Sequence, residues 1–133
     1  YWMPGGPKLD VERYAKANAA ASQRNFEIIR KLRANYPENH IYFIDYGRIA
    51  SEMKAQFTSD ELPDIEQLVG RDSASLFLDG LMGHGGPVMT QLSARTWLNL
   101  LYGVEIKKVG QTLLSTEAEE IAIKLVAYNE QFN

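Results

Sequence analysis

Residues 41–45, Ile-Tyr-Phe-Ile-Asp, constrain the fold of this chain more than any other segment. β-Branched and aromatic side chains favour an extended backbone, and this run is almost continuously apolar. Continuous apolarity is typical of a strand that is buried on both faces, as in a parallel sheet covered by helices. The segment therefore predicts a layered α/β fold with a parallel sheet.

Four other stretches have the apolar spacing or the end signals of helices. Asp10 is a suitable N-cap for the first of them, and Pro37 follows its end. Gly103 is a natural residue just beyond the end of the third. A capping box, Thr116 to Glu119, opens the fourth. We expect helices at about residues 11–35, 48–57, 88–102 and 116–128.

The remaining apolar segments are too short to complete a sheet. Residues 1–3 resemble the end of a buried strand, residues 76–78 a short final strand, and residues 58–75 an irregular polar segment. A sheet of this class usually has about five or six strands. We therefore expect an additional polypeptide segment or chain to complete the sheet, and we interpret a start at Tyr1 as the start of a truncated or processed piece.

Composition excludes several classes of function. A length of 133 residues with 45% hydrophobic content suits one domain or a large part of one. The net charge of −3 argues against a nucleic-acid-binding surface, which requires clustered lysine and arginine. The absence of cysteine excludes disulfides and thiolate-based metal sites. No apolar run reaches the roughly 18 residues that span a bilayer. The sequence does not determine the cellular compartment of the protein.

The glycine-rich loop of residues 79–87 contains the most convincing acid/base pair, Asp79 and His84. It follows a predicted strand end, where ligands gather in open α/β sheets. Histidine titrates near neutral pH and suits proton transfer, and a carboxylate on its other ring nitrogen would orient it. The alternative is a mobile loop with an exposed histidine, in which Asp79 caps the local backbone.

Three segments resemble the SGNH-type (GDSL-like) hydrolases. SLFLDGLMGHGGPVMTQLSARTWLNLLYGV is similar to the family's C-terminal block, in which an Asp and a His follow the last strand and precede a helix. YWMPGGPKLD resembles the strand and loop after the middle blocks, and NHIYFIDYGRIASEM the penultimate strand and helix. The resemblance covers residues 1–103, a hydrolase-like core, and leaves 104–133 as a C-terminal helical extension.

The resemblance implies a three-layer flavodoxin-like hydrolase or acyl transferase acting on small-molecule or glycan acyl esters, without a cofactor. His84 would be the general base that activates a serine, and Asp79 would orient it. Gly83, Gly85 and Trp2 would contact substrate, although Trp2 also suits core packing.

The chain departs from the family pattern in two ways. Four residues separate Asp79 from His84, where the family usually has two. Either the loop carries an insertion or Asp79 is not the orienting acid. The Gly-Asp-Ser nucleophile block and the oxyanion-hole blocks are also missing, so the serine must come from outside this chain. The rival interpretation is a non-catalytic hydrolase-like binding module.

Other candidate residues have weaker support. Ser73, Ser75 and Ser93 do not lie in the sharp strand-to-helix turn that exposes a nucleophile. Asp45 either caps the following helix or contributes to a site at the strand end. A metal site built from Asp45, Asp79 and His84 has suitable ligand types, but no spacing in the sequence singles it out.

Overall fold

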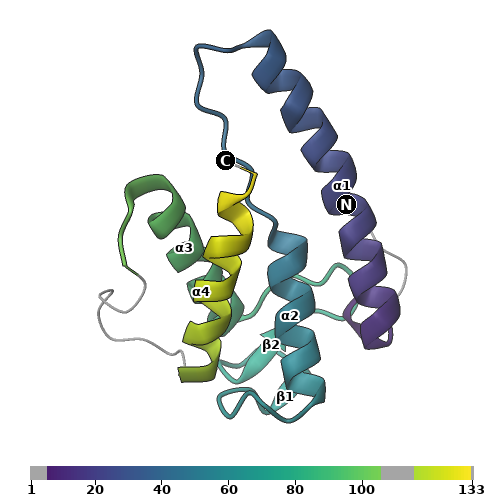
Figure 1. Ribbon diagram of the computed structural model, residues 1–133. Helices are drawn as coiled ribbons and strands as arrows, with labels where there is room; N and C mark the ends of the chain where they lie inside the picture. The colour runs from purple at the N-terminus through teal and green to yellow at the C-terminus, as the bar shows by residue number, and fades with distance from the viewer. Residues whose placement is uncertain (1–5, 106–115, 133) are drawn as a thin grey trace.

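The computed structural model describes residues 6–105 and 116–132. A short 3-10 helix, η1 (Gly6–Lys8), precedes α1 (Val11–Asn35) and α2 (Tyr46–Thr58). Two three-residue strands follow, β1 (Gln67–Val69) and β2 (Ser75–Phe77). The helices α3 (Pro87–Tyr102) and α4 (Thr116–Glu130) complete the described part. Figure 1 shows α2, α3 and α4 packed beside one another, with the strands below α2 and the far half of α1 extending beyond the body.

The prediction of a three-layer flavodoxin-like fold with a central parallel sheet is wrong. In the described residues, β1 and β2 form a two-stranded parallel sheet, with Gln67 opposite Ser75 and Val69 opposite Phe77. Most of the other described residues are helical. The fold is a small helical assembly with a minimal sheet at one end, and it lacks the central sheet that three layers require.

The strand prediction for residues 41–45 is also wrong, although the segment is not helical either. The Ile41 carbonyl accepts hydrogen bonds from the Arg33 guanidinium, with Nε at 2.8 Å. The Asp45 backbone N–H donates to Oδ1 of Asn129 at 2.8 Å. Strand propensity favours an extended backbone, but a strand forms only where the backbone of a neighbouring strand supplies the hydrogen bonds. Here side chains from α1 and α4 supply them.

The strand β1 lies in the segment that was expected to be irregular. The link from β1 to the parallel strand β2 is a loop of residues 70–74 organised by Asp72, whose Oδ1 accepts from the Ala74 backbone N–H at 3.1 Å and from the Ser75 hydroxyl at 2.7 Å. The Gly70 N–H donates to the Phe77 carbonyl at 2.9 Å. Side-chain bonds of this kind define a turn without any apolar alternation in the sequence.

The helix predictions are confirmed to within a few residues. Asp10 caps α1, with Oδ1 accepting from the Arg13 N–H at 2.8 Å. The helix α2 begins earlier than expected because Asp45 caps it, accepting from the Arg48 N–H at 2.9 Å. Gly103 ends α3 with a φ of 66°, and its N–H donates to the Asn99 carbonyl.

The apolar core lies between β2 and the helices α2, α3 and α4. The helix α1 contributes a single buried residue, Tyr14, which packs edge-on against Phe77 with ring centroids 5.9 Å apart. Lys54 of α2 is buried, and its Nζ donates to the Pro7 carbonyl at 2.8 Å, which links η1 to α2. The helix α4 belongs to this same core through several buried residues. The central core residues are Ile49, Met53, Leu76, Phe77, Val88, Met89, Leu92, Ile121, Ala122 and Leu125.

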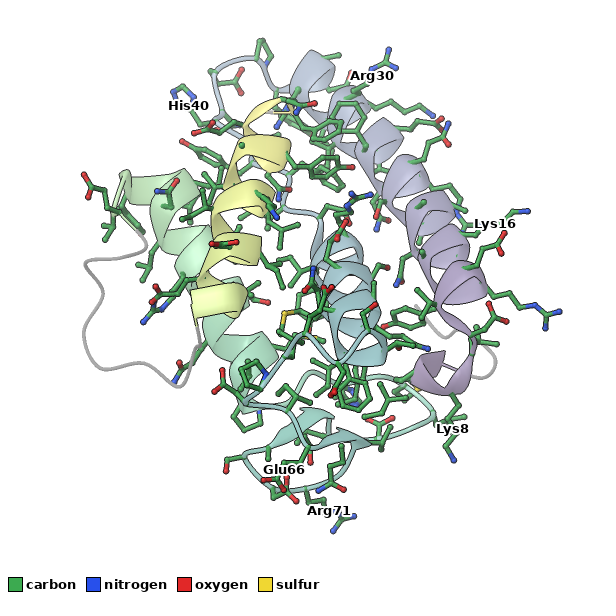
Figure 2. The ribbon with its side chains drawn as sticks, turned by 60° about the horizontal axis from the view of Figure 1, so that its bottom comes forward. Lys8, Lys16, Arg30, His40, Glu66 and Arg71 are labelled. Atoms are coloured by element: carbon green, nitrogen blue, oxygen red, sulfur yellow. The ribbon has the colours of Figure 1, made fainter. Side chains whose placement is uncertain are left out.

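Charged side chains such as Lys16 and Arg30 on α1, and Glu66 and Arg71 near the strands, point outward from the body (Figure 2). His40 lies in the exposed connection between α1 and α2. None of the helices in the described part of the chain combines the length and apolar composition that crossing a bilayer requires.

Candidate functional site

The Asp79–His84 loop is closed at its base by backbone hydrogen bonds. The Leu78 N–H donates to the His84 carbonyl at 2.8 Å, and the Gly86 N–H donates to the Leu76 carbonyl at 2.7 Å. The chain thus leaves β2, turns, and returns antiparallel beside it before α3 begins. These two hydrogen bonds fix the ends of the loop between β2 and α3, which both belong to the core.

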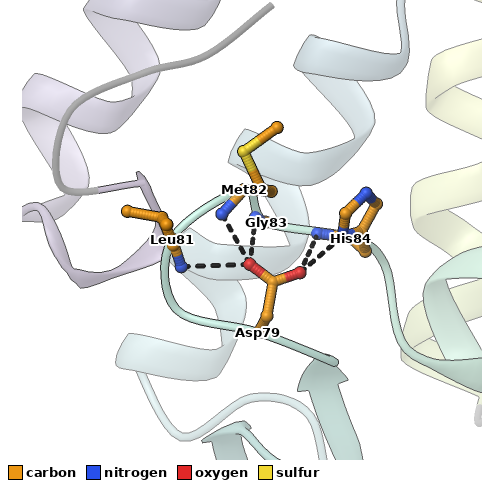
Figure 3. A network of polar contacts seen from close by, with 5 residues as sticks. All are labelled: Asp79, Leu81, Met82, Gly83 and His84. Carbon is orange, nitrogen blue, oxygen red and sulfur yellow. Dashed lines mark hydrogen bonds and ion pairs between the residues drawn. The ribbon is translucent and has the colours of Figure 1, made fainter.

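The Asp79 carboxylate is the centre of the loop (Figure 3). Its Oδ1 accepts from the backbone N–H groups of Leu81 at 3.0 Å, Met82 at 2.5 Å and Gly83 at 3.1 Å. Its Oδ2 accepts from the His84 N–H at 3.3 Å and lies 2.5 Å from His84 Nδ1. The polypeptide wraps one carboxylate with four successive amides and an imidazole.

These contacts favour the ionised form of Asp79. The Met82 N–H has the largest effect and lowers the pKa of the Asp79 carboxyl; desolvation, the second largest, opposes it. The His84 imidazole and the N–H groups of Gly83 and Leu81 add to the lowering, and together these hydrogen bonds hold the pKa well below its usual range. Gly83 has a φ of 73°, in the left-handed region that favours glycine. That conformation turns its N–H toward the carboxylate.

His84 is exposed at the loop surface, with 69% of its side chain accessible, against 34% for Asp79. Its Nδ1 is engaged by Asp79, and the far side of the ring faces away from the carboxylate (Figure 3). A carboxylate on Nδ1 with a free Nε2 is the arrangement that orients a histidine as a general base. The four-residue separation in the sequence therefore still permits the Asp79–His84 contact.

The structure does not bring every predicted residue to this loop. Trp2 lies outside the described residues. The N–H of Gly83 is occupied by Asp79. Gly85 lies opposite Phe77 in an isolated antiparallel bridge, and a Cβ atom there would lie 2.3 Å from the Tyr46 hydroxyl oxygen. Gly85 thus allows Tyr46 to approach the backbone closely.

No serine hydroxyl of the described segments forms a hydrogen bond with His84. Ser75 is buried and donates to Asp72, and Ser93 donates to the Met89 carbonyl in its own helix at 2.8 Å. Residues 6–105 and 116–132 also contain no cluster of three or more histidine and acidic side chains able to hold a metal. Asp45 therefore does not join Asp79 and His84.

Asp45 instead belongs to a second polar centre, whose other members, Ser22 and Tyr128, sequence reasoning missed. It is 4% exposed, and Ser22 of α1 donates to its Oδ1 at 2.5 Å. The Tyr128 hydroxyl of α4 lies 3.4 Å from Oδ2. Ser22 and Tyr128 lie 23 and 83 residues from Asp45 in the sequence, so no local pattern identifies them.

Comparisons of this chain with protein-family models, with curated proteins and with solved structures found no match. The functional interpretation therefore depends on the residues and on their geometry.

Proposed function

We propose that the Asp79–His84 loop provides the acid–histidine pair of a carboxylic-ester hydrolase or a related acyl transferase. The observation that carries this proposal is the 2.5 Å contact between Asp79 Oδ2 and His84 Nδ1 in an exposed loop. The contact orients the ring and would stabilise the imidazolium that forms when Nε2 takes a proton. The resemblance of the loop to SGNH-type hydrolases adds support for a serine as the nucleophile.

In the proposed reaction, Nε2 of His84 takes the proton of a serine hydroxyl while the serine oxygen attacks the ester carbonyl carbon. The bond from that carbon to the alcohol oxygen then breaks, and the imidazolium returns the proton to the leaving alcohol. Water then attacks the acyl carbon while the same nitrogen takes its proton; the bond from that carbon to the serine oxygen breaks, the acid leaves, and the imidazolium returns the proton to the serine. In a transferase a second alcohol takes the place of water. The serine and the oxyanion-hole donors would come from outside the described residues.

One observation favours a second candidate function, a non-catalytic binding module. Asp79 accepts hydrogen bonds from four backbone N–H groups, which is a complete structural role for this side chain. In this alternative the carboxylate shapes the loop, and the exposed His84 and Leu81 contact a ligand that is not turned over.

A fluorophosphonate probe, which labels serine hydroxyls activated by a neighbouring base, separates the two candidates. The probe is applied to the longest polypeptide in which this sequence occurs, and the labelled peptide is located by mass spectrometry. His84→Ala is compared with His40→Ala, a matched control because His40 is the other histidine of the chain and is also exposed.

The ester-hydrolase proposal requires labelling of one serine in the wild type and in His40→Ala, and its loss in His84→Ala. Labelling that persists in His84→Ala contradicts the role of His84 as the base. A wild-type protein that takes no label and hydrolyses no activated ester contradicts the enzymatic proposal and favours the binding module. Because an exposed imidazole cleaves activated esters slowly by itself, ester turnover alone does not decide the question.

A further inference from the structure

Two cavities meet at the buried Asp45 carboxylate, and the larger one also reaches Met82 and Gly83 of the Asp79–His84 loop. They have volumes of about 230 and 280 Å³. Four residues line both of them, namely Asn18 and Ser22 of α1 and Phe43 and Asp45 before α2. The carboxylate therefore stands at the junction of two spaces that α1 covers.

The smaller cavity has an aromatic wall made of Phe26, Phe43, Tyr128 and Phe132. Phe132 is packed against the other three, with ring centroids 4.8 Å from Phe26, 5.9 Å from Phe43 and 5.1 Å from Tyr128. The rings come from α1, from the segment before α2, from the last turns of α4 and from the residues just after it, so tertiary contacts hold them in place. A wall of this kind offers π faces and edges to a bound group.

The Asp45 carboxylate keeps part of its capacity to accept hydrogen bonds. Its Oδ1 is occupied by the Ser22 hydroxyl and by the Arg48 backbone N–H. Its Oδ2 has a single long contact, 3.4 Å from the Tyr128 hydroxyl. Oδ2 thus remains able to accept a stronger bond.

The charges around the cavity leave Asp45 without an ionic partner among the described residues. Arg48 is the cationic side chain of the lining, and its Nη2 pairs with Glu52 at 2.5 Å. The Arg48 guanidinium also lies 5.4 Å from the Tyr128 ring centroid. Glu52 lies outside the lining and offsets the charge of Arg48, so Asp45 is the charged group of the lining that no described side chain pairs with.

From this arrangement we propose that the smaller cavity, which Asp45 and the aromatic wall line, binds a small organic cation. The ligand is a protonated amine that carries a single ring or a short hydrocarbon body. The ammonium group donates to Asp45 Oδ2, and the body lies among the aromatic rings, where cation–π attraction adds to apolar burial. A cavity of about 150 Å³ accommodates benzene, so the observed volume admits one ring with a short amino-bearing arm. An anion of the same shape would be repelled by Asp45.

The test titrates the folded protein with three compounds of one shape and different charge: benzylammonium, benzyl alcohol and benzoate. NMR shifts of Ser22, Asp45 and Tyr128 report occupancy of this cavity. We expect benzylammonium to bind with a dissociation constant of order 1 mM or below, at least about tenfold more tightly than benzyl alcohol, and benzoate not to bind. Equal binding of the amine and the alcohol, or no binding of the amine, overturns the proposal.

Three variants locate the binding. Asp45→Asn retains an oxygen that can cap α2 and is expected to weaken benzylammonium binding at least about tenfold. Phe26→Ala removes part of the wall without touching the cap, so it tests the cavity independently of helix α2. Glu66→Gln, at an exposed carboxylate beside β1 that lines neither cavity, is the control and should leave the affinity within about twofold. If neither Asp45→Asn nor Phe26→Ala changes benzylammonium binding, the assignment of this cavity is overturned. That conclusion does not depend on the result of the His84→Ala labelling experiment.

Discussion

Asp79 Oδ2 lies 2.5 Å from Nδ1 of His84, while Oδ1 of the same carboxylate binds three backbone N–H groups of the intervening loop. One side chain therefore controls both the path of the loop and the orientation of the imidazole. Oδ1 serves the loop backbone alone, whereas Oδ2 faces the imidazole and has one longer contact, at 3.3 Å, with the His84 N–H. Substitutions at Asp79 can separate the two roles.

Asp79→Asn is expected to keep the loop and change the histidine. An amide oxygen can still accept at the Oδ1 position, but the NH2 group at the Oδ2 position cannot accept from His84 Nδ1–H. The imidazole proton should therefore move from Nδ1 toward Nε2, which ¹⁵N NMR of the ring detects. Asp79→Ala should additionally accelerate amide exchange at Leu81 and Met82 by roughly tenfold. Identical exchange rates in the wild type and Asp79→Ala would show that the carboxylate does not organise the loop.

The stabilising effect of Asp79 should depend on pH below about 4. Hydrogen bonds hold the pKa of this carboxyl well below its usual range in the folded state, whereas an unfolded chain has an ordinary aspartate pKa of about 3.9. As the pH falls, the unfolded state takes up the proton first, so stability is fully present above that value and is lost toward the folded pKa. The difference in Tm between the wild type and Asp79→Asn should be constant above about pH 5 and should narrow progressively from there to about pH 2. A constant difference across this range would contradict the prediction.

Asn129 should be important for stability although it lies far from the loop. It is fully buried; Oδ1 accepts from the Asp45 N–H at 2.8 Å, and Nδ2 donates to the Leu125 carbonyl at 2.7 Å. Asn129→Ala leaves the buried Asp45 N–H without this acceptor and should lower the free energy of unfolding by about 1–3 kcal/mol. Asn35→Ala, at the exposed end of α1, should change it by less than about 0.5 kcal/mol. Similar losses in the two variants, measured by denaturant unfolding, would count against the bridging role.

The ion pair between α3 and α4 should contribute more than the one on the surface of α2. Arg95 Nη1 lies 3.1 Å from Glu119 Oε1, and their side chains are only 6% and 23% exposed. Glu119→Gln should destabilise the protein by about 1.5–3 kcal/mol, because it removes the charge facing a buried guanidinium. The matched control is Glu52→Gln, which breaks a pair exposed at 51% and 36% and should cost less than about 1 kcal/mol. Equal losses in urea titrations would refute the distinction.

The candidate acid–histidine pair was visible in the sequence because its contacts are local. Asp79 and His84 are five residues apart, and glycines between and beside them allow the tight turn. The Asp45 centre was only half visible, since Asp45 stood out at the end of an apolar run. Its partners Ser22 and Tyr128 come from helices distant in the sequence, and no spacing rule connects them to it.

By itself the sequence determined where the helices begin and end, because caps such as Asp10 and Gly103 act within a few residues of the positions they affect. Only the tertiary structure decided the role of residues 41–45. Their composition favours a strand, but pairing needs a neighbouring backbone, and in this structure Arg33 and Asn129 bind Ile41 and Asp45 instead. Local interactions define the helices, and long-range contacts hold the expected central strand as an irregular segment whose buried residues Phe43 and Asp45 line a cavity.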